Sequence, residues 1–277
     1  MEWFDALILG LVQGLTEYLP VSSSGHLEIF KQILGVDLPD DQNLMFSVMV
    51  HAATVLSTIV VLRKLFFRLC RSFFTVRRDE DFQTVCKILL SCIPVGIVGV
   101  FLKKQVEEIF GSGLLVVGIC LCVTALLLTF AYYSDFQRGT GRLKPADAGR
   151  RIGWWDALII GVAQAVAVLP GLSRSGTTIA TGILLRNRRA EVATFSFLMV
   201  ILPILGEALL DVVKMLGSPA DTGGAAVGVF PLLTGFAAAF ASGCCACAWM
   251  ISLVKRGKLL WFAIYCVIMG AICILWN

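Results

Sequence analysis

Long apolar runs alternate with short polar connections along this chain of 277 residues. A helix needs about 17 to 25 apolar residues to cross the hydrocarbon core of a bilayer. Six runs are that long, at 44–62, 85–102, 114–133, 192–216, 227–254 and 259–276. Two shorter runs, 6–19 and 157–169, lead into polar stretches. We expect these two to be the first arms of re-entrant helical hairpins, because broken backbone is tolerated at membrane depth only where protein or water covers it.

The pattern occurs twice. WFDALILGLVQ at 3–13 aligns with WWDALIIGVAQ at 154–164, with seven of eleven positions identical. The polar stretch EYLPVSSSGH at 17–26 then corresponds to VLPGLSRSGTT at 168–178, and three long apolar runs follow each stretch. Because each copy crosses the membrane an odd number of times, the second copy is predicted to be inverted relative to the first.

The predicted fold is an all-α polytopic membrane protein with an inverted-topology repeat. Each half is expected to hold one re-entrant helical hairpin plus three transmembrane helices. The chain then forms a single membrane domain, 1–277, with a first repeat at 1–133, a cytoplasmic linker at 134–153 and a second, inverted repeat at 154–277.

Composition and charge agree with a membrane location. Hydrophobic residues make up 58% of the chain and charged residues only 15%. Of the 23 Lys and Arg residues, 17 fall in four connections, at 63–83, 134–153, 186–189 and 255–258, which predicts that these connections face the cytoplasm and both termini lie outside. Topology alone accounts for the basic clusters, so they indicate anionic membrane lipids as neighbours and no nucleic-acid partner.

The two polar stretches carry the candidate chemistry. Pro20 and Pro170 each stop a helix, and the following serines and glycines are suited to start the next one. Helix N-termini bind phosphate through free N–H groups, so two tips that converge would hold a diphosphate. The candidate substrate-binding residues at and beside the tips are Gln13, Ser22, Ser24, Gly25, Ser173, Ser175, Gly176 and Thr178.

The copies differ at the positions best suited to catalysis. An ionisable side chain is costly inside a membrane, so Glu17 is a functional candidate. Arg174 carries a permanent charge and can grip phosphate oxygens in two places. Each of these candidates aligns with a different residue in the other copy: Glu17 with Val168, Ser23 with Arg174, and His26 with Thr177. A transport site often stays nearly symmetric, so this asymmetry between the copies favours catalysis by Glu17, Ser23, His26 and Arg174.

Structural roles compete with these assignments. Glu17 and Arg174 would also serve as an ion pair that ties the two hairpins together. His26 lies one turn beyond Ser23, which favours a role in the site over a structural histidine. His51 is isolated in the first full span, and we expect it to be structural.

The motifs resemble those of the bacterial undecaprenyl pyrophosphate phosphatase family. QGLTEYLPVSSSGH at 13–26 matches the family pattern (E/Q)xxxE followed by PxSSxGH, and PGLSRSGTT at 170–178 matches PGxSRSxxT. The resemblance implies a hydrolase of the bacterial plasma (inner) membrane that removes the terminal phosphate of undecaprenyl diphosphate. It would recycle the lipid carrier for peptidoglycan synthesis and give bacitracin resistance.

The resemblance also implies site residues and a cofactor. The residues matching the family's active site are Glu17, Ser23, His26 and Arg174, in a site open to the periplasm, and activity requires a divalent cation, Mg²⁺ or Ca²⁺, with Glu17 as a ligand. The first position of the acidic motif is Gln13 and not a glutamate, which the family pattern permits but which weakens a metal site built from two carboxylates.

Two mechanisms and two function classes follow from the residues. Ser23 attacks the terminal phosphorus with Glu17 or His26 as base, or a water held by Glu17 and His26 attacks directly. The alternative function is a lipid-phosphate flippase or secondary transporter that uses the same midplane anion site, because inverted repeats with broken helices are typical of transporters. The expected partners are a polyprenyl diphosphate lipid and membrane lipids, and the sequence leaves a homodimer open.

Overall fold

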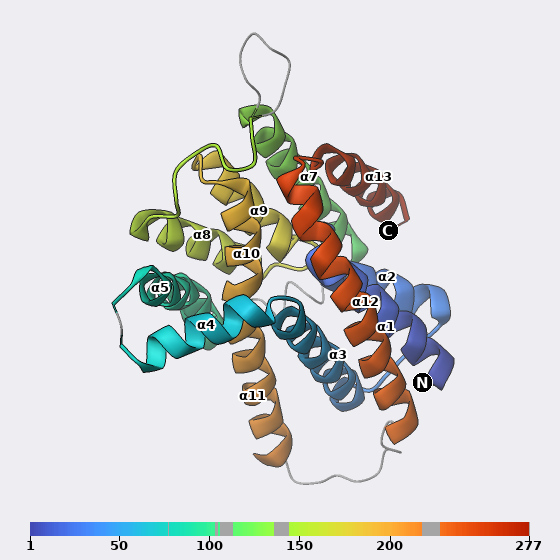
Figure 1. The fold of residues 1–277 in the computed structure, drawn as a ribbon. Coiled ribbons are helices and arrows are strands. Elements are labelled where there is room, and N and C mark those ends of the chain that lie inside the picture. The colour runs from blue at the N-terminus through green and yellow to red at the C-terminus, as the bar shows by residue number, and fades with distance from the viewer. Residues whose placement is uncertain (77, 103–104, 106–112, 136–143, 218–227, 277) are drawn as a thin grey trace.

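The computed structural model describes residues 1–76, 78–102, 105, 113–135, 144–217 and 228–276 (Figure 1). Helices make up nearly all of this part of the chain. They are α1 (Trp3–Tyr18), α2 (Ser23–Leu34), α3 (Asp40–Val61), α4 (Arg63–Phe74), α5 (Glu80–Phe101), α7 (Leu114–Ser134), α8 (Trp154–Val166), α9 (Arg174–Leu184), α10 (Arg189–Met199), α11 (Ile201–Gly217), α12 (Val229–Lys255) and α13 (Leu260–Trp276).

Five candidate membrane spans occur among the described residues. They are Gln42–Val61, Glu80–Phe101, Leu114–Ser134, Arg189–Val213 and Val229–Lys255. The sixth predicted span corresponds to α13, which is apolar but only 17 residues long. The protein is therefore an all-α, multi-pass membrane protein, as the apolar runs predict.

The predicted span at 192–216 is divided in the structure. α10 ends at Met199 and α11 begins at Ile201. Pro203 explains the break, because its ring has no N–H and clashes with the carbonyl four residues earlier, which belongs to Met199. The Cys92 thiol donates a hydrogen bond to that carbonyl over 3.4 Å, so the freed acceptor is satisfied from α5.

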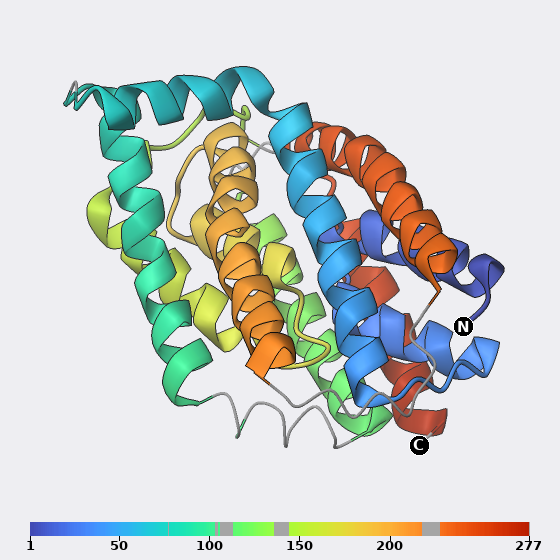
Figure 2. The same ribbon diagram turned by 90° about the horizontal axis from the view of Figure 1, so that it is seen from below.

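Much of the basic connection 63–83 is helical. α4 lies across the ends of α3 and α5, where it is drawn in cyan (Figure 2). Phe67 and Phe74 are exposed on it, and Arg68 pairs with Asp81 over 2.9 Å. Exposed aromatic and basic side chains on one short helix are typical of a helix that lies in a membrane interface.

Four short helices meet at the centre of the molecule. α1 and α2 are joined by a turn at 19–22, and α8 and α9 by a turn at 167–173. At a rise of about 1.5 Å per residue, none of the four is long enough to cross about 30 Å of hydrocarbon. The Ser175 hydroxyl donates to the Leu19 carbonyl over 3.1 Å, so the two turns are in contact, as the sequence predicts.

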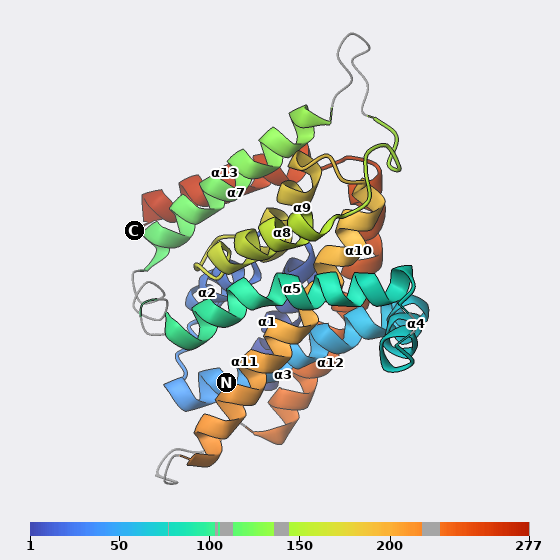
Figure 3. The same ribbon diagram turned by 90° about the vertical axis from the view of Figure 1, so that its left-hand side faces the viewer.

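Glycines allow the long helices to approach the short ones closely. α1 packs along α12, and α8 packs along α5 (Figure 3). A Cβ on Gly10 would lie 2.3 Å from the Gly235 carbonyl oxygen, and one on Gly161 would lie 2.4 Å from the Ser91 carbonyl oxygen. Membrane helices commonly pack through small residues at such contacts, and here these contacts hold α1 and α8, the helices that precede the two turns, in place.

Candidate active site

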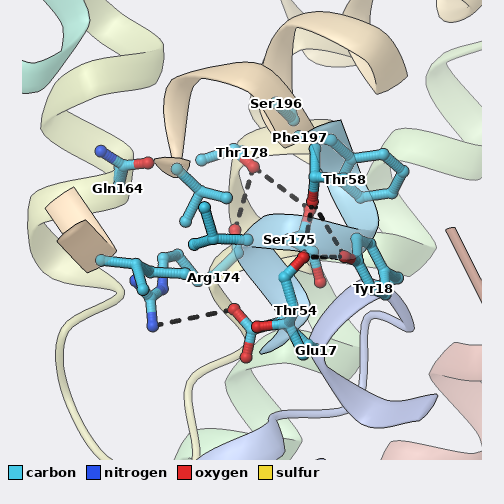
Figure 4. Close-up of a pocket in the computed structure, with 13 residues that line it drawn as sticks. Glu17, Tyr18, Thr54, Thr58, Gln164, Arg174, Ser175, Thr178, Ser196 and Phe197 are labelled. Atoms are coloured by element: carbon cyan, nitrogen blue, oxygen red, sulfur yellow. Dashed lines mark hydrogen bonds and ion pairs between the residues drawn. The ribbon is translucent and has the colours of Figure 1, made fainter. Parts of the chain in front are cut away.

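A pocket lies where the two turns meet. α1 and α3 line it from the first half of the chain, and α8, α9, α10 and the start of α11 line it from the second half (Figure 4). Its polar lining includes Glu17 and Thr58 on one side, and Gln164, Arg174 and Ser196 on the other.

Glu17 is the centre of the polar contacts. Its side chain is 7% exposed, and Oε2 accepts hydrogen bonds from Gln13 Nε2 over 2.9 Å and from Ser23 Oγ over 2.7 Å. Arg174 Nη2 lies 3.9 Å from Oε1. Because one turn of helix separates Gln13 from Glu17, they share a face of α1, and the turn at Pro20 folds the first residue of α2 back toward that face. The structure thus brings together three of the four predicted catalytic residues.

Ser23 depends on a constrained turn. Ser22 has φ 70°, a conformation that is uncommon for a residue other than glycine, and its hydroxyl accepts from the Gly25 N–H as the cap of α2. His26 Nδ1 lies 2.8 Å from the Ser22 carbonyl oxygen. That carbonyl can only accept, so Nδ1 donates and secures the strained residue next to Ser23.

His26 contacts Ser22 and Tyr265 through its two ring nitrogens. Its Nε2 lies 2.6 Å from the Tyr265 hydroxyl, and the two rings stack with centroids 5.6 Å apart. In the neutral ring that donates at Nδ1, Nε2 accepts from Tyr265. Both ring nitrogens are therefore engaged, and the geometry suits His26 to hold the turn in place.

Two further residues of the site did not emerge from the sequence. His51 was expected to be structural, yet its Nε2 lies 4.0 Å from Glu17 Oε2 while its Nδ1 is 2.8 Å from the Ser47 carbonyl oxygen. Tyr18 is buried, and its hydroxyl contacts Thr58 Oγ1 over 2.8 Å, which ties α1 to α3. A signal was present, because polar residues recur at helical spacing on one face of this apolar span, at Ser47, His51, Thr54 and Thr58.

The predicted substrate-binding residues divide into two groups. Ser175 and Thr178 line the pocket, although the Thr178 hydroxyl also donates to the Arg174 carbonyl over 3.0 Å. Ser173 caps α9, since its hydroxyl accepts from the Gly176 N–H over 3.1 Å. The remaining predicted residues at the tips serve helix starts and close packing, with Ser24 Oγ 3.3 Å from Ser22 Oγ, Gly25 against Val117, and Gly176 against Pro20.

A buried carboxylate, a serine that donates to it and a nearby arginine lie together between short helices at the centre of a multi-pass membrane protein. Residues 6–272 match the family model described as "Bacitracin resistance protein BacA". The chain belongs to this family.

Several relatives are similar over nearly their whole length. A protein of Bacteroides fragilis named "Undecaprenyl-diphosphatase" is 55% identical over 99% of this chain and 98% of its own. A protein of the same name from Parabacteroides distasonis is 56% identical over 99% of this chain and 98% of its own. Another from Korarchaeum cryptofilum is 38% identical over 98% of this chain and 97% of its own.

Proposed function

We propose that this protein is an integral membrane phosphatase that hydrolyses undecaprenyl diphosphate to undecaprenyl phosphate and inorganic phosphate. Family membership and the names of its relatives support this activity. The observation that carries it is the 2.7 Å hydrogen bond from Ser23 to Glu17, beside Arg174. The reaction would recycle the lipid carrier for peptidoglycan synthesis and, at high abundance, give bacitracin resistance.

Ser23 and Glu17 form a nucleophile and base pair. Because the Ser23 hydroxyl already donates to Glu17, the carboxylate is placed to take its proton as attack begins. Ser23 Oγ forms a bond to the terminal phosphorus while the bridging P–O bond breaks, and undecaprenyl phosphate leaves with the electron pair. In the second step water attacks the phosphoserine, Glu17 returns its proton to Ser23 Oγ, and the protons of water leave with inorganic phosphate.

Arg174 supplies a positive charge that can stabilise the transferred phosphoryl group. Its side chain is 24% exposed, and a guanidinium can bind two phosphate oxygens at once. Phosphoryl transfer depends chiefly on positioning and on stabilising charge on the transferred group. The N-termini of α2 and α9, where the turns meet, add backbone N–H groups that can also donate hydrogen bonds to a phosphate.

The residues beside Glu17 fit a divalent cation. Gln13 Oε1 is buried and has no hydrogen-bond partner within the described part of the chain. With the Glu17 carboxylate and the Ser23 hydroxyl it gives an all-oxygen donor set, which Mg²⁺ or Ca²⁺ prefers when phosphate and water complete the shell. Such a cation would neutralise the charge of the diphosphate. Glu17 is the one carboxylate of this set, since glutamine occupies position 13.

The short helices support an inverted repeat with two re-entrant hairpins. Gly10 and Gly161 hold equivalent positions in the two copies, and each makes its closest contact with a long helix of the opposite copy, α12 or α5. This exchange is what two interlocked repeats, 1–133 and 154–277, would produce. The basic connections, including the linker 134–153, would face the cytoplasm of a bacterial inner membrane, and the site would open to the periplasm.

Hydrolysis in detergent separates the phosphatase from a flippase or transporter. The purified full chain, in detergent micelles with no second compartment, is expected to release inorganic phosphate from undecaprenyl diphosphate. A chelator should abolish the release, and added Mg²⁺ or Ca²⁺ should restore it. A protein that is folded in micelles, receives either cation and still releases no phosphate would contradict the proposal and favour the transport function.

A further inference from the structure

The side of the pocket away from Glu17 carries polar groups that the proposed reaction does not use. Gln164 on α8 is fully buried, and Ser196 on α10 is 3% exposed. Neither Gln164 Nε2, Gln164 Oε1 nor Ser196 Oγ has a hydrogen-bond partner within the described residues. Both residues line the pocket with Arg174, and Figure 4 shows them across it from Glu17.

Such groups are costly unless something binds them. A buried polar group with no partner loses its hydrogen bonds to water without replacement, so native proteins leave few of them. In the first copy, the equivalent Gln13 donates to Glu17, and Ser47 lies next to His51. The second copy has valine at both partner positions, 168 and 200, while the glutamine and the serine are still present.

The chemistry of these groups selects a phosphate oxyanion. Gln164 Nε2 and Ser196 Oγ are donors, and Arg174 adds a permanent positive charge on the same side of the pocket. Gln164 Oε1 can accept from the O–H of a protonated phosphate. Glu17, to which the Ser23 hydroxyl donates, lies on the opposite side of the pocket (Figure 4), so these donors would hold the phosphoryl oxygens that face away from Ser23.

We infer that Gln164 and Ser196 form a binding subsite for the terminal phosphoryl group, both before its transfer and as the inorganic phosphate that is released. This assignment rests on the proposed function, because it names the part of the same pocket that holds the transferred group. Hydrogen bonds to a charged ligand are worth about 1.5 to 3 kcal/mol each, so the loss of one should weaken phosphate binding by about 10-fold or more.

The test measures phosphate binding by the full chain without requiring turnover. Thermal unfolding in detergent is followed at increasing concentrations of inorganic phosphate, for wild type, Gln164→Leu and Ser196→Ala. Both variants are expected to need about 10-fold more phosphate than wild type to reach the same rise in unfolding temperature. With no phosphate present, Gln164→Leu should unfold at the wild-type temperature or above, because it removes orphaned polar atoms while keeping the volume.

A matched variant controls for the loss of a buried hydroxyl. Ser91 is fully buried on α5, but its hydroxyl donates to the Ile88 carbonyl over 2.7 Å and it does not line the pocket. Ser91→Ala should leave phosphate binding unchanged. If Gln164→Leu does not fold, Ser196→Ala removes a single oxygen atom and still decides the question.

Kinetics with undecaprenyl diphosphate show whether the subsite binds the terminal phosphoryl group of the substrate, the released inorganic phosphate, or both. A rise in KM together with weaker inhibition by inorganic phosphate in Gln164→Leu would place both substrate and product in the subsite. Weaker product inhibition alone would assign it to released phosphate. Unchanged phosphate binding in folded Gln164→Leu and Ser196→Ala would overturn the inference and leave the phosphatase intact. A wild-type protein that binds phosphate but does not hydrolyse the lipid would refute the proposed function instead.

Discussion

Glu17→Gln is expected to lower phosphate release by about 10²- to 10⁴-fold, the usual contribution of a positioned general base. Glutamine has nearly the same shape as glutamate and can still accept the hydrogen bond from Ser23, but it cannot take the proton. Ser23→Ala, which removes the nucleophile, should cause a loss at least as large. Initial rates in detergent, measured at equal amounts of folded protein, test both changes.

The control for this prediction is an acid outside the pocket. Glu28 is exposed on α2, and Glu28→Gln makes the same chemical change without touching the site. It should keep wild-type activity. If Glu17 and Ser23 only pack the two turns together, Glu17→Gln and Ser23→Ala should remain active but melt at lower temperature, and that result would contradict the assigned roles.

Arg174→Lys is expected to slow turnover by about 10²- to 10³-fold, as loss of one preorganised stabilising contact does. Lysine keeps the positive charge, so attraction for the lipid diphosphate and hence KM should change little. What it lacks is the planar fork that binds two oxygens of the transferred group. The measurement is the initial rate against undecaprenyl diphosphate concentration, with the exposed Arg63→Lys as the matched control.

A purely architectural role for Arg174 makes the opposite prediction. An ion pair with Glu17 at 3.9 Å would accept lysine readily, and turnover would stay near the wild-type value. In that case Arg174→Met combined with Glu17→Leu should also give a stable fold, because buried ion pairs can be replaced by apolar residues of similar volume. Near-wild-type turnover in Arg174→Lys would therefore exclude the phosphate clamp.

The apolar pattern predicted most of the fold because membrane helices need long apolar runs. The predicted span 114–133 differs from α7 by one residue at its end. The break between α10 and α11 was missed because the run is continuously apolar, and only the effect of Pro203 on the carbonyl of Met199 divides it. α4 was missed because a connection that is basic and aromatic reads as a loop when only its polarity is considered.

The site was predictable where its contacts are local in sequence. Gln13, Glu17 and Ser23 fall within eleven residues, so helix periodicity and one turn bring them together. His26 is held by Tyr265, which lies 239 residues away, and no local pattern indicates that contact. The comparison of the two copies identified Arg174. His51 lies on another helix than Glu17, and the polar face of α3 that includes it does not indicate which residue it meets.

The central claim is that Ser23 Oγ accepts the terminal phosphoryl group, and a trapped intermediate tests it most directly. Wild-type protein is mixed with undecaprenyl diphosphate labelled in its terminal phosphate, quenched in acid within the first turnover, digested, and examined for labelled peptides. We expect phosphoserine at Ser23, none in Ser23→Ala, and decay of the label as inorganic phosphate appears. Repeated early quenches that capture full phosphate release with no label on Ser23 would contradict it and assign the attack to water.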